Sequence, residues 1–209
     1  RLYPASRTDR PKQFQSFGGD RSLLRRAVDR VAFLDEIFVV TRAAYAEQVR
    51  DIVPDTTVLV EPEAKDTGPA LVYAAHEIKR RLSDPVLLCL PSDHVIGEGF
   101  QADAMQAIEV AERTRGLVTL GITPTRVATE YGYILPGNRR DGYAPVDAFH
   151  EKPDDEDAAV LLERGARWNA GIFAWRPQPF LEAALLSPLE PLVQALESGD
   201  PADGYAVVP

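Results

Sequence analysis

Residues 36–61 have the sequence EIFVVTRAAYAEQVRDIVPDTTVLVE. The short β-branched run EIFVVT is typical of a buried strand. The apolar residues of AAYAEQVRDIV recur at helical spacing, and TVLVE is a second short apolar run. A strand, a helix and a second strand at this spacing favour a mostly parallel sheet that is covered on both sides.

The same alternation extends in both directions along the chain. Apolar positions at helical spacing predict helices over residues 22–34, 67–82 and 100–115, and short apolar runs predict strands over 86–90 and 117–123. We therefore predict an α/β fold with a Rossmann-like, mostly parallel central sheet and helices on both faces. Such sheets bind ligands beyond the carboxyl ends of their strands.

The pattern changes after residue 123. The predicted elements are then strands over 131–136 and 144–152, a helix over 154–164, a strand over 168–175 and two helices separated by Ser187-Pro188. We expect this half to form an antiparallel extension that walls off a pocket. Residues 1–209 are expected to form one domain, since no repeat, low-complexity tract or linker interrupts them.

The composition is that of an ordinary soluble protein. The chain has 209 residues, of which 45% are hydrophobic and 26% charged, and its net charge is −9 with a pI near 4.9. An acidic protein of this kind is not drawn to nucleic acids or membrane surfaces, so we expect neither as a partner. No run of 18 apolar residues is present, and the single cysteine, Cys89, lies in an apolar run, which favours a reducing compartment and a cytoplasmic location.

The first 14 residues, RLYPASRTDRPKQF, form a loop rich in cations. Arg1 offers a planar fork of donors and Lys12 a compact point charge, and both suit phosphate oxygens. Pro4 and Pro11 stiffen the loop because each fixes its own φ. A solvated basic surface is the alternative, since charged residues are usually exposed.

A carboxylate, Glu61, ends the predicted strand TVLVE. A carboxylate only accepts hydrogen bonds, and the pairing edge of guanine presents two adjacent donors, N1–H and the N2 amino group. Uracil and thymine present one N–H between two carbonyl groups, which a carboxylate repels. Glu61 therefore predicts that the site prefers guanine, because another base would leave buried polar groups without a hydrogen-bond partner. The alternative is that Glu61 is a solvated glutamate at the end of a strand.

Asp93 follows the predicted strand over 86–90, so its carboxylate is expected to project into the ligand crevice. Mg²⁺ prefers oxygen ligands and usually shares them with substrate phosphates, which makes Asp93 a candidate magnesium ligand. A helix or turn cap is the alternative. The neighbouring His94 is expected to have a structural role, because magnesium seldom takes imidazole.

Four further candidates lie near strand ends in the second half. Gly132 stands between two tyrosines, where a glycine lets the backbone approach a ligand closely. Glu151 and Lys152 are adjacent, so they point to opposite faces and serve one ligand only if the strand bends there. Asn169 carries an amide that can both donate to and accept from a pair of hydroxyl groups.

An ordered set of segments resembles the sugar nucleotidyltransferases, and most closely the mannose-1-phosphate guanylyltransferases. The segments are RLYPASRTDRPKQF, EPEAKDTGP at 61–69, PSDH at 91–94, TPTRVATEYGYI at 123–134, FHEKP at 149–153 and WNAGIF at 168–173. The resemblance implies transfer of GMP from GTP to mannose 1-phosphate, giving GDP-mannose and pyrophosphate, with Mg²⁺ held by Asp93. It also assigns roles to catalytic Arg1 and Lys12, to nucleotide-binding Glu61, Pro62, Thr67 and Gly68, and to sugar-phosphate-binding Gly132, Glu151, Lys152 and Asn169. Thr67 is also suited to a purely structural role as a helix N-cap.

The sequence lacks three segments that are typical of this family. The glycine-rich turn G-G-x-G-T, which precedes the cationic loop in the family, is absent, and so are the later S-(I/V)-D-x-x-x-x-E and W-x-D-x-G-x-W segments. Either the sequence is incomplete, with a first strand missing ahead of Arg1, or the protein is a divergent fragment. The alternatives in function are a nucleotidyltransferase for another sugar 1-phosphate or base, and a non-catalytic regulatory relative that binds GDP-mannose. The sequence leaves a homodimer open.

Overall fold

The computed structural model describes residues 11–208. The strands in this part are β1 (Phe38–Arg42), β2 (Thr57–Glu61), β3 (Leu87–Cys89), β4 (Val118–Ile122), β5 (Gly132–Pro136), β6 (Val146–Glu151) and β7 (Arg167–Trp175). The helices are η1 (Lys12–Phe14, a 3-10 helix), α1 (Leu23–Arg30), α2 (Ala43–Ile52), α3 (Thr67–Lys79), α4 (Phe100–Thr114), α5 (Asp155–Glu163), α6 (Pro177–Ala184), α7 (Glu190–Ser198) and α8 (Pro201–Val207).

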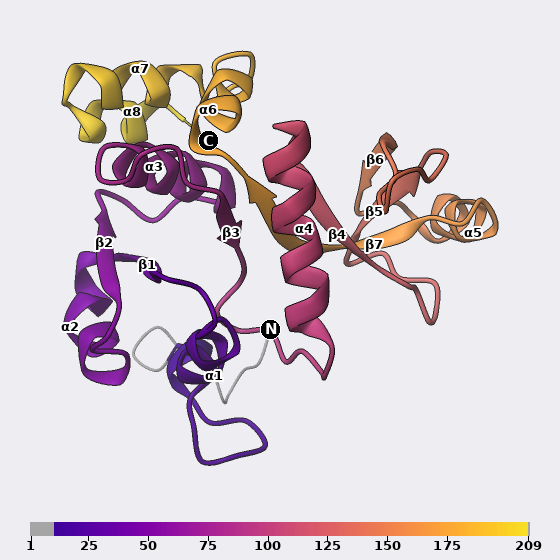
Figure 1. Ribbon diagram of the computed structural model, residues 1–209, viewed down its shortest axis with the longest axis horizontal. Coiled ribbons are helices and arrows are strands. Elements are labelled where there is room, and N and C mark those ends of the chain that lie inside the picture. The colour runs from indigo at the N-terminus through magenta and orange to yellow at the C-terminus, as the bar shows by residue number, and fades with distance from the viewer. Residues whose placement is uncertain (1–10, 209) are drawn as a thin grey trace.

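Strands β1 and β2 form a parallel pair with helices on both faces (Figure 1). Their side chains alternate between the two faces, as the pleat of a strand requires. Val39 and Val58 pack into the core that α1 and α2 supply, whereas Val40 and Leu59 pack with Ile78 of α3 on the other face. The predicted order of strand, helix and strand over 36–61 is confirmed.

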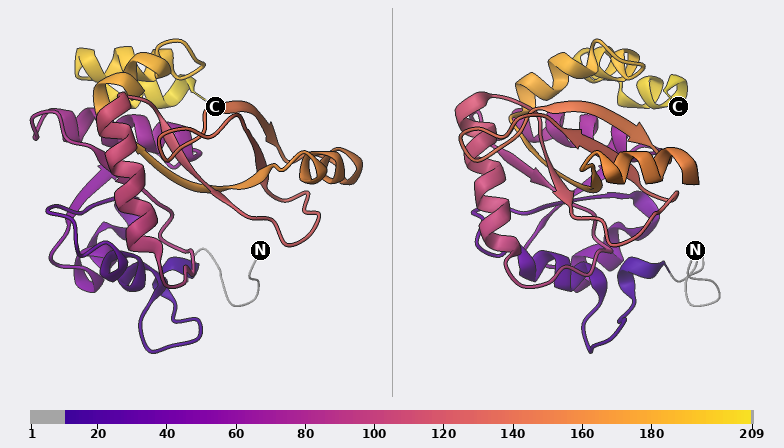
Figure 2. Two further views of the ribbon diagram at one scale, coloured as in Figure 1. Left: turned by 45° about the vertical axis from the view of Figure 1, so that its right-hand side comes forward. Right: turned by 90° about the vertical axis from the view of Figure 1, so that its right-hand side faces the viewer.

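The larger sheet is built around β7. This strand pairs antiparallel with β3, β4 and β5, and β6 continues the sheet beyond β5. Because β3 and β4 are both antiparallel to β7, they run parallel to each other without sharing hydrogen bonds. Figure 2 shows β5, β6 and α5 as an arm that extends away from the β1–β2 layer. The α/β class and the antiparallel extension are confirmed, and direct parallel pairing among the described residues is confined to β1 and β2.

Helix α1 is shorter than predicted. It ends at Arg30 rather than at residue 34, and Val31 and Leu34 continue as a turn that packs against Phe100 of α4. The apolar pattern beyond Arg30 therefore reflects burial in a second core and not a continued helical face.

The C-terminal helices α6, α7 and α8 form a layer on α3. Their shared core includes Val72 and Ala75 of α3, Leu181 of α6, Leu192 of α7 and Tyr205 of α8. Figure 1 shows α7 and α8 lying over α3 at one end of the molecule. The sequence predicted two helices after the strand that forms β7. Helix α8 was not predicted, and it carries Tyr205 into the core.

A close approach between α7 and α8 depends on Gly204. A Cβ atom at this position would lie 2.9 Å from the Cα of Leu192 and 2.7 Å from the Cβ of Ala195. The substitution Gly204→Val should therefore destabilise the protein by roughly 1–3 kcal/mol through overpacking. We expect this to lower the Tm measured by circular dichroism by roughly 2–10 °C.

The control for this prediction is Ala206→Val, which places the same side chain at an exposed position of α8. Its Tm should stay close to that of the unmodified protein. Equal Tm values for the two variants would show that α8 does not pack against α7 as the structure has it.

Candidate functional site

Lys12 is held by a short structured segment. It opens the 3-10 helix η1, whose last residue, Phe14, packs into the core beneath α1 and α2 and lies edge-on to Tyr45 with ring centroids 5.5 Å apart. The carbonyl oxygen of Gln15 accepts a hydrogen bond of 3.0 Å from the amide of Leu23. These contacts fix the backbone beside Lys12 against the first helix.

Asp93 lies in the turn that follows β3, and its carboxylate forms an ion pair with the ammonium group of Lys12. The Lys12 side chain is 46% exposed and that of Asp93 is 18% exposed, so the pair lies at the surface. Arg30 of α1 donates a hydrogen bond of 3.1 Å to the carbonyl oxygen of His94, which ties the turn to the helix. Lys12 and Asp93, which the motifs assign to catalysis and to metal binding, are therefore in contact, and their roles stay predictions. Arg1 lies outside the described residues.

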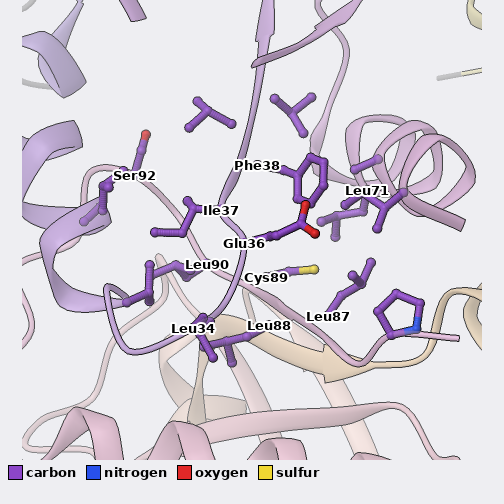
Figure 3. Close-up of a pocket in the computed structure, with 18 of the residues that line it drawn as sticks. Leu34, Glu36, Ile37, Phe38, Leu71, Leu87, Leu88, Cys89, Leu90 and Ser92 are labelled. Carbon is purple, nitrogen blue, oxygen red and sulfur yellow. The ribbon is translucent and has the colours of Figure 1, made fainter. Parts of the chain in front are cut away.

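A cavity of about 600 Å³ separates β1 from β3. Its walls are mainly apolar and come from β1, β3, α1 and α3 (Figure 3). Among the polar residues on the lining, Thr67 and Ser92 belong to the segments that follow β2 and β3. The candidate nucleotide segment and the candidate magnesium segment therefore border the same cavity.

The thiol of Cys89 also lines this cavity, where Figure 3 shows it among Leu87, Leu88 and Glu36. The residue is partly exposed, because the cavity reaches it, and most of the residues that line the cavity with it are apolar. Burial raises the pKa of the Cys89 thiol to about 12, since a thiolate is poorly solvated there. The Cys89 thiol is therefore protonated at neutral pH.

Glu61 ends β2 and is half-buried. The hydroxyl group of Tyr205 lies 3.3 Å from Glu61 Oε2 and 3.3 Å from the carbonyl oxygen of Pro69. Burial raises the pKa of Glu61, while the hydrogen bond from Tyr205 and the charge of Arg42 act in the opposite direction. Burial next to the Glu61 carboxylate also raises the pKa of Tyr205, so this phenol stays protonated and can donate.

The other candidate nucleotide residues follow Glu61 along the chain. Pro62 and Thr67 are exposed, and Thr67 is the first residue of α3. The N-cap of this helix is Asp66, so the alternative role of Thr67 as N-cap is wrong. Gly68 lies beneath Leu189, since a Cβ atom there would be 3.1 Å from Leu189 Cδ1.

Gly132, Glu151 and Lys152 lie together on the β5–β6 hairpin. Gly132 pairs with Glu151 across the two strands, and a Cβ atom on Gly132 would lie 2.8 Å from Glu151 Oε2. Lys152 has φ of +46°, so the chain turns sharply where β6 ends. The turn brings the Lys152 ammonium group to 2.8 Å from Glu151 Oε1. Glu151 and Lys152 can serve one ligand only if the strand bends there, and this bend is present.

Asn169 lies on β7, opposite Gly121 of β4. Its Oδ1 atom accepts hydrogen bonds from Thr119 Oγ1 at 3.2 Å and from the Gly171 amide at 3.0 Å. These bonds fix the orientation of the amide. Gly171 in turn lies against Pro91, with 3.6 Å between its ideal Cβ position and Pro91 Cγ. Asn169 is thus two residues from a contact with the loop that carries Asp93.

The described residues hold no group of three or more histidine, cysteine, aspartate or glutamate side chains that could bind a metal ion together. Asp93 nevertheless suits Mg²⁺, because this ion is usually held by one or two carboxylates together with substrate phosphates and water. Among residues 11–208, no helix is long and apolar enough to cross a membrane.

Two residues near the candidate side chains were not predicted. Tyr205 contacts Glu61 across 144 positions of sequence, and Thr119 contacts Asn169 across 50 positions. Asp200-Pro201 is a recognisable start for a helix, but no local pattern connects that helix to the end of β2.

Comparisons with known proteins identify the class. The chain matches the family model described as nucleotidyl transferase over residues 1–198, and it therefore belongs to that family. A solved structure described as mannose-1-phosphate geranyltransferase from Thermus thermophilus superposes with a TM-score of 0.90 at 31% sequence identity, covering 100% of this chain and 64% of that one.

The similar curated proteins agree with the resemblance in the motifs. The chain is 41% identical over 192 residues to the xanthan biosynthesis protein XanB of Xanthomonas campestris pv. campestris. It is 36% identical over 201 residues to mannose-1-phosphate guanylyltransferase 2 of Escherichia coli O157:H7. Each match covers 87% of this chain but only 41% and 42% of the relatives, so the chain spans about two fifths of their length. The predicted family is confirmed.

The Cys89 thiol should react slowly in the folded protein. At a given pH below 9, a pKa of about 12 in place of 9.0 lowers the thiolate fraction by roughly 10³. We expect labelling by a thiol reagent at mildly alkaline pH to be slower by roughly this factor than labelling in guanidinium chloride.

A matched control moves the thiol to the surface. In the variant Cys89→Ser/Ser83→Cys, the thiol occupies an exposed turn and should react quickly in the folded state. Rapid labelling of Cys89 in the folded unmodified protein would contradict the assigned pKa.

Proposed function

We propose that the protein transfers GMP from GTP to mannose 1-phosphate, giving GDP-mannose and pyrophosphate. Membership of the nucleotidyl transferase family and relatives named mannose-1-phosphate guanylyltransferase support this reaction. The observation that carries the proposal is the contact between Lys12 and Asp93 beside the end of β3. A cation for phosphate oxygens and a carboxylate for a metal are the two parts that transfer from a nucleoside triphosphate requires.

The reaction needs charge stabilisation rather than a general base. A phosphate oxygen of mannose 1-phosphate is already an adequate nucleophile toward the α-phosphorus of GTP. Catalysis is then a matter of holding the two substrates in line and neutralising negative charge as pyrophosphate leaves. Lys12 is proposed to supply positive charge to the triphosphate and the leaving pyrophosphate, together with Arg1.

Asp93 is proposed to hold Mg²⁺. When bound, this ion neutralises charge on the phosphate oxygens. The Asp93 carboxylate has to exchange its contact with Lys12 for the metal, and the partial exposure of both side chains permits the exchange. Lys12 is then free to contact a phosphate group.

The remaining candidates are proposed to select the two substrates. Glu61 accepts hydrogen bonds from N1–H and the N2 amino group of guanine, with Pro62, Thr67 and Gly68 beside the nucleotide. On the sugar side, Glu151 and Asn169 bind hydroxyl groups, Lys152 binds the sugar phosphate, and Gly132 leaves room for close approach. The location is proposed to be cytoplasmic, because a single cysteine in an apolar run favours a reducing compartment, and a homodimer stays a prediction.

The decisive experiment measures pyrophosphate release. The protein is incubated with Mg²⁺, GTP and mannose 1-phosphate, and in parallel with GTP and glucose 1-phosphate. Release that depends on mannose 1-phosphate supports the proposal. Release with glucose 1-phosphate or with another nucleotide would point to a different sugar or base, and binding of GDP-mannose without release would point to the regulatory alternative.

Lys12→Ala should lower kcat by roughly 10²–10³, as the loss of one charge-stabilising donor does in other enzymes. Mg²⁺ and both substrates are kept saturating, and pyrophosphate release is followed over time. Lys79→Ala removes an exposed ammonium group from α3 and should leave kcat unchanged. Near-normal turnover in Lys12→Ala would remove Lys12 from the mechanism.

Asp93→Asn should weaken the dependence on magnesium while keeping the shape of the side chain. We expect the Mg²⁺ concentration for half-maximal rate to rise by about tenfold or more, because a neutral amide is a poorer ligand than a carboxylate. Asp55→Asn makes the same change in an exposed turn after α2 and serves as the control. An unchanged Mg²⁺ requirement in Asp93→Asn would mean that other groups hold the ion.

A further inference from the structure

Tyr205 lies where the C-terminal helical layer meets the end of β2. Its side chain is only 1% exposed and belongs to the core that α3, α6, α7 and α8 share. Its ring packs edge-on against Tyr73 of α3, with centroids 6.2 Å apart and planes at 80°. Close packing on all sides allows the ring few alternatives, so the core fixes the position of the Tyr205 hydroxyl group.

This hydroxyl group has two acceptors at the same distance. Glu61 Oε2 and the carbonyl oxygen of Pro69 each lie 3.3 Å away. A phenol has one proton to donate, and a hydrogen bond to an ionised acceptor is stronger than one to a neutral carbonyl group. The Glu61 carboxylate is therefore the preferred acceptor whenever it is ionised.

We propose that Tyr205 is a positioning residue for base recognition, whose hydroxyl group holds the Glu61 carboxylate in the orientation that guanine requires. The inference rests on the proposed function, because it takes Glu61 as the residue that contacts the base. Among residues 11–208, Tyr205 is the one side chain that donates a hydrogen bond to Glu61. The nearby cation, Arg42, instead donates to Tyr45 at 2.5 Å and lies over its ring.

Orientation matters because the last torsion of a glutamate side chain is broad and roughly two-fold. Without a fixed donor, the carboxylate has to be ordered when the base binds, and that ordering weakens binding. The hydrogen bond from Tyr205 occupies one of about four lone-pair sites on the carboxylate. Glu61 Oε1 and a second lone pair of Oε2 stay available for the two donors of guanine.

The charge state of Glu61 also supports a role for Tyr205 in base recognition. Burial raises the pKa of this carboxyl group, and the hydrogen bond from Tyr205 lowers it. The ionised carboxylate only accepts hydrogen bonds, whereas a protonated carboxyl group presents a donor to the base. Tyr205 therefore helps to keep the form of Glu61 that complements N1–H and the N2 amino group.

The test compares GTP with ITP, which lacks the N2 amino group. For each variant, the ratio of kcat/KM for GTP to kcat/KM for ITP is measured with mannose 1-phosphate. The ratio does not depend on the concentration of active protein, so partial unfolding of a variant does not change it. The corresponding ratio of Kd values, obtained by calorimetry, needs no turnover.

Tyr205→Phe keeps the ring and removes the hydroxyl group. We expect KM for GTP to rise by about tenfold, kcat to stay within about twofold, and the GTP-to-ITP ratio to fall by about three- to tenfold. Tyr73→Phe removes a hydroxyl group from the neighbouring ring, which makes no hydrogen bond to Glu61, and should leave the ratio unchanged. In the Glu61→Gln background, Tyr205→Phe should have no further effect on the ratio.

The outcomes separate this inference from the proposed function. If Glu61→Gln abolishes the preference for GTP but Tyr205→Phe leaves the ratio intact, Tyr205 is only a core residue and the inference is wrong. If Tyr73→Phe lowers the ratio as much as Tyr205→Phe does, general packing is responsible and the inference is again wrong. If Glu61→Gln itself keeps the preference, or the unmodified protein does not bind GTP, the proposed role of Glu61 fails and takes the inference with it.

Discussion

Strand β7 is the element on which the arrangement of the candidate site depends. It pairs with β3 along its carboxyl-terminal end, with β5 near its beginning, and with β4 along its other edge. The pairing of β7 with β3 is accompanied by a contact between Gly171 and Pro91. This contact holds the turn that carries Asp93 close to the segment that carries Asn169. The strand pairings also join the β5–β6 hairpin, with Glu151 and Lys152, to the rest of the protein. One antiparallel strand therefore links the proposed metal side to the proposed sugar side.

The β1–β2 pair is positioned differently, because no strand among the described residues bonds it to the larger sheet. The edges of β1 and β3 face each other across an apolar cavity, with α1 and α3 on its walls (Figure 3). The N–H and C=O groups at the edge of a strand are unpaired unless another strand, a side chain or water forms hydrogen bonds with them. Among the described residues no strand bridges β1 and β3, so this cavity is lined by two strand edges that lack a strand partner on that side.

Local patterns in the sequence predicted the elements well and their pairing less well. Residues 57–61 and 43–52 formed the expected strand and helix, because alternation and helical spacing are local properties. The run 168–175 was expected as a strand, but an apolar run does not encode the direction of its neighbours, so the dominance of antiparallel pairing through β7 could not be derived. The contact between Lys12 and Asp93 came from the ordered motifs, and Tyr205 was missed because its partner lies 144 positions away.

The two halves of the proposed nucleotide site differ in how firmly they are held. The ion pair of Lys12 and Asp93 is partly exposed, and pairs of this kind contribute about 0–1 kcal/mol, so phosphates and a metal can replace it at little cost. The hydroxyl group of Tyr205 is held in place by a packed core, so its hydrogen bond to the half-buried Glu61 has less freedom. A preformed base-binding side and an exchangeable phosphate-binding side suit a reaction in which the nucleoside is retained while pyrophosphate leaves. On the proposed assignment, the rigid contact lies where the base is selected, and the exchangeable ion pair lies where bonds form and break.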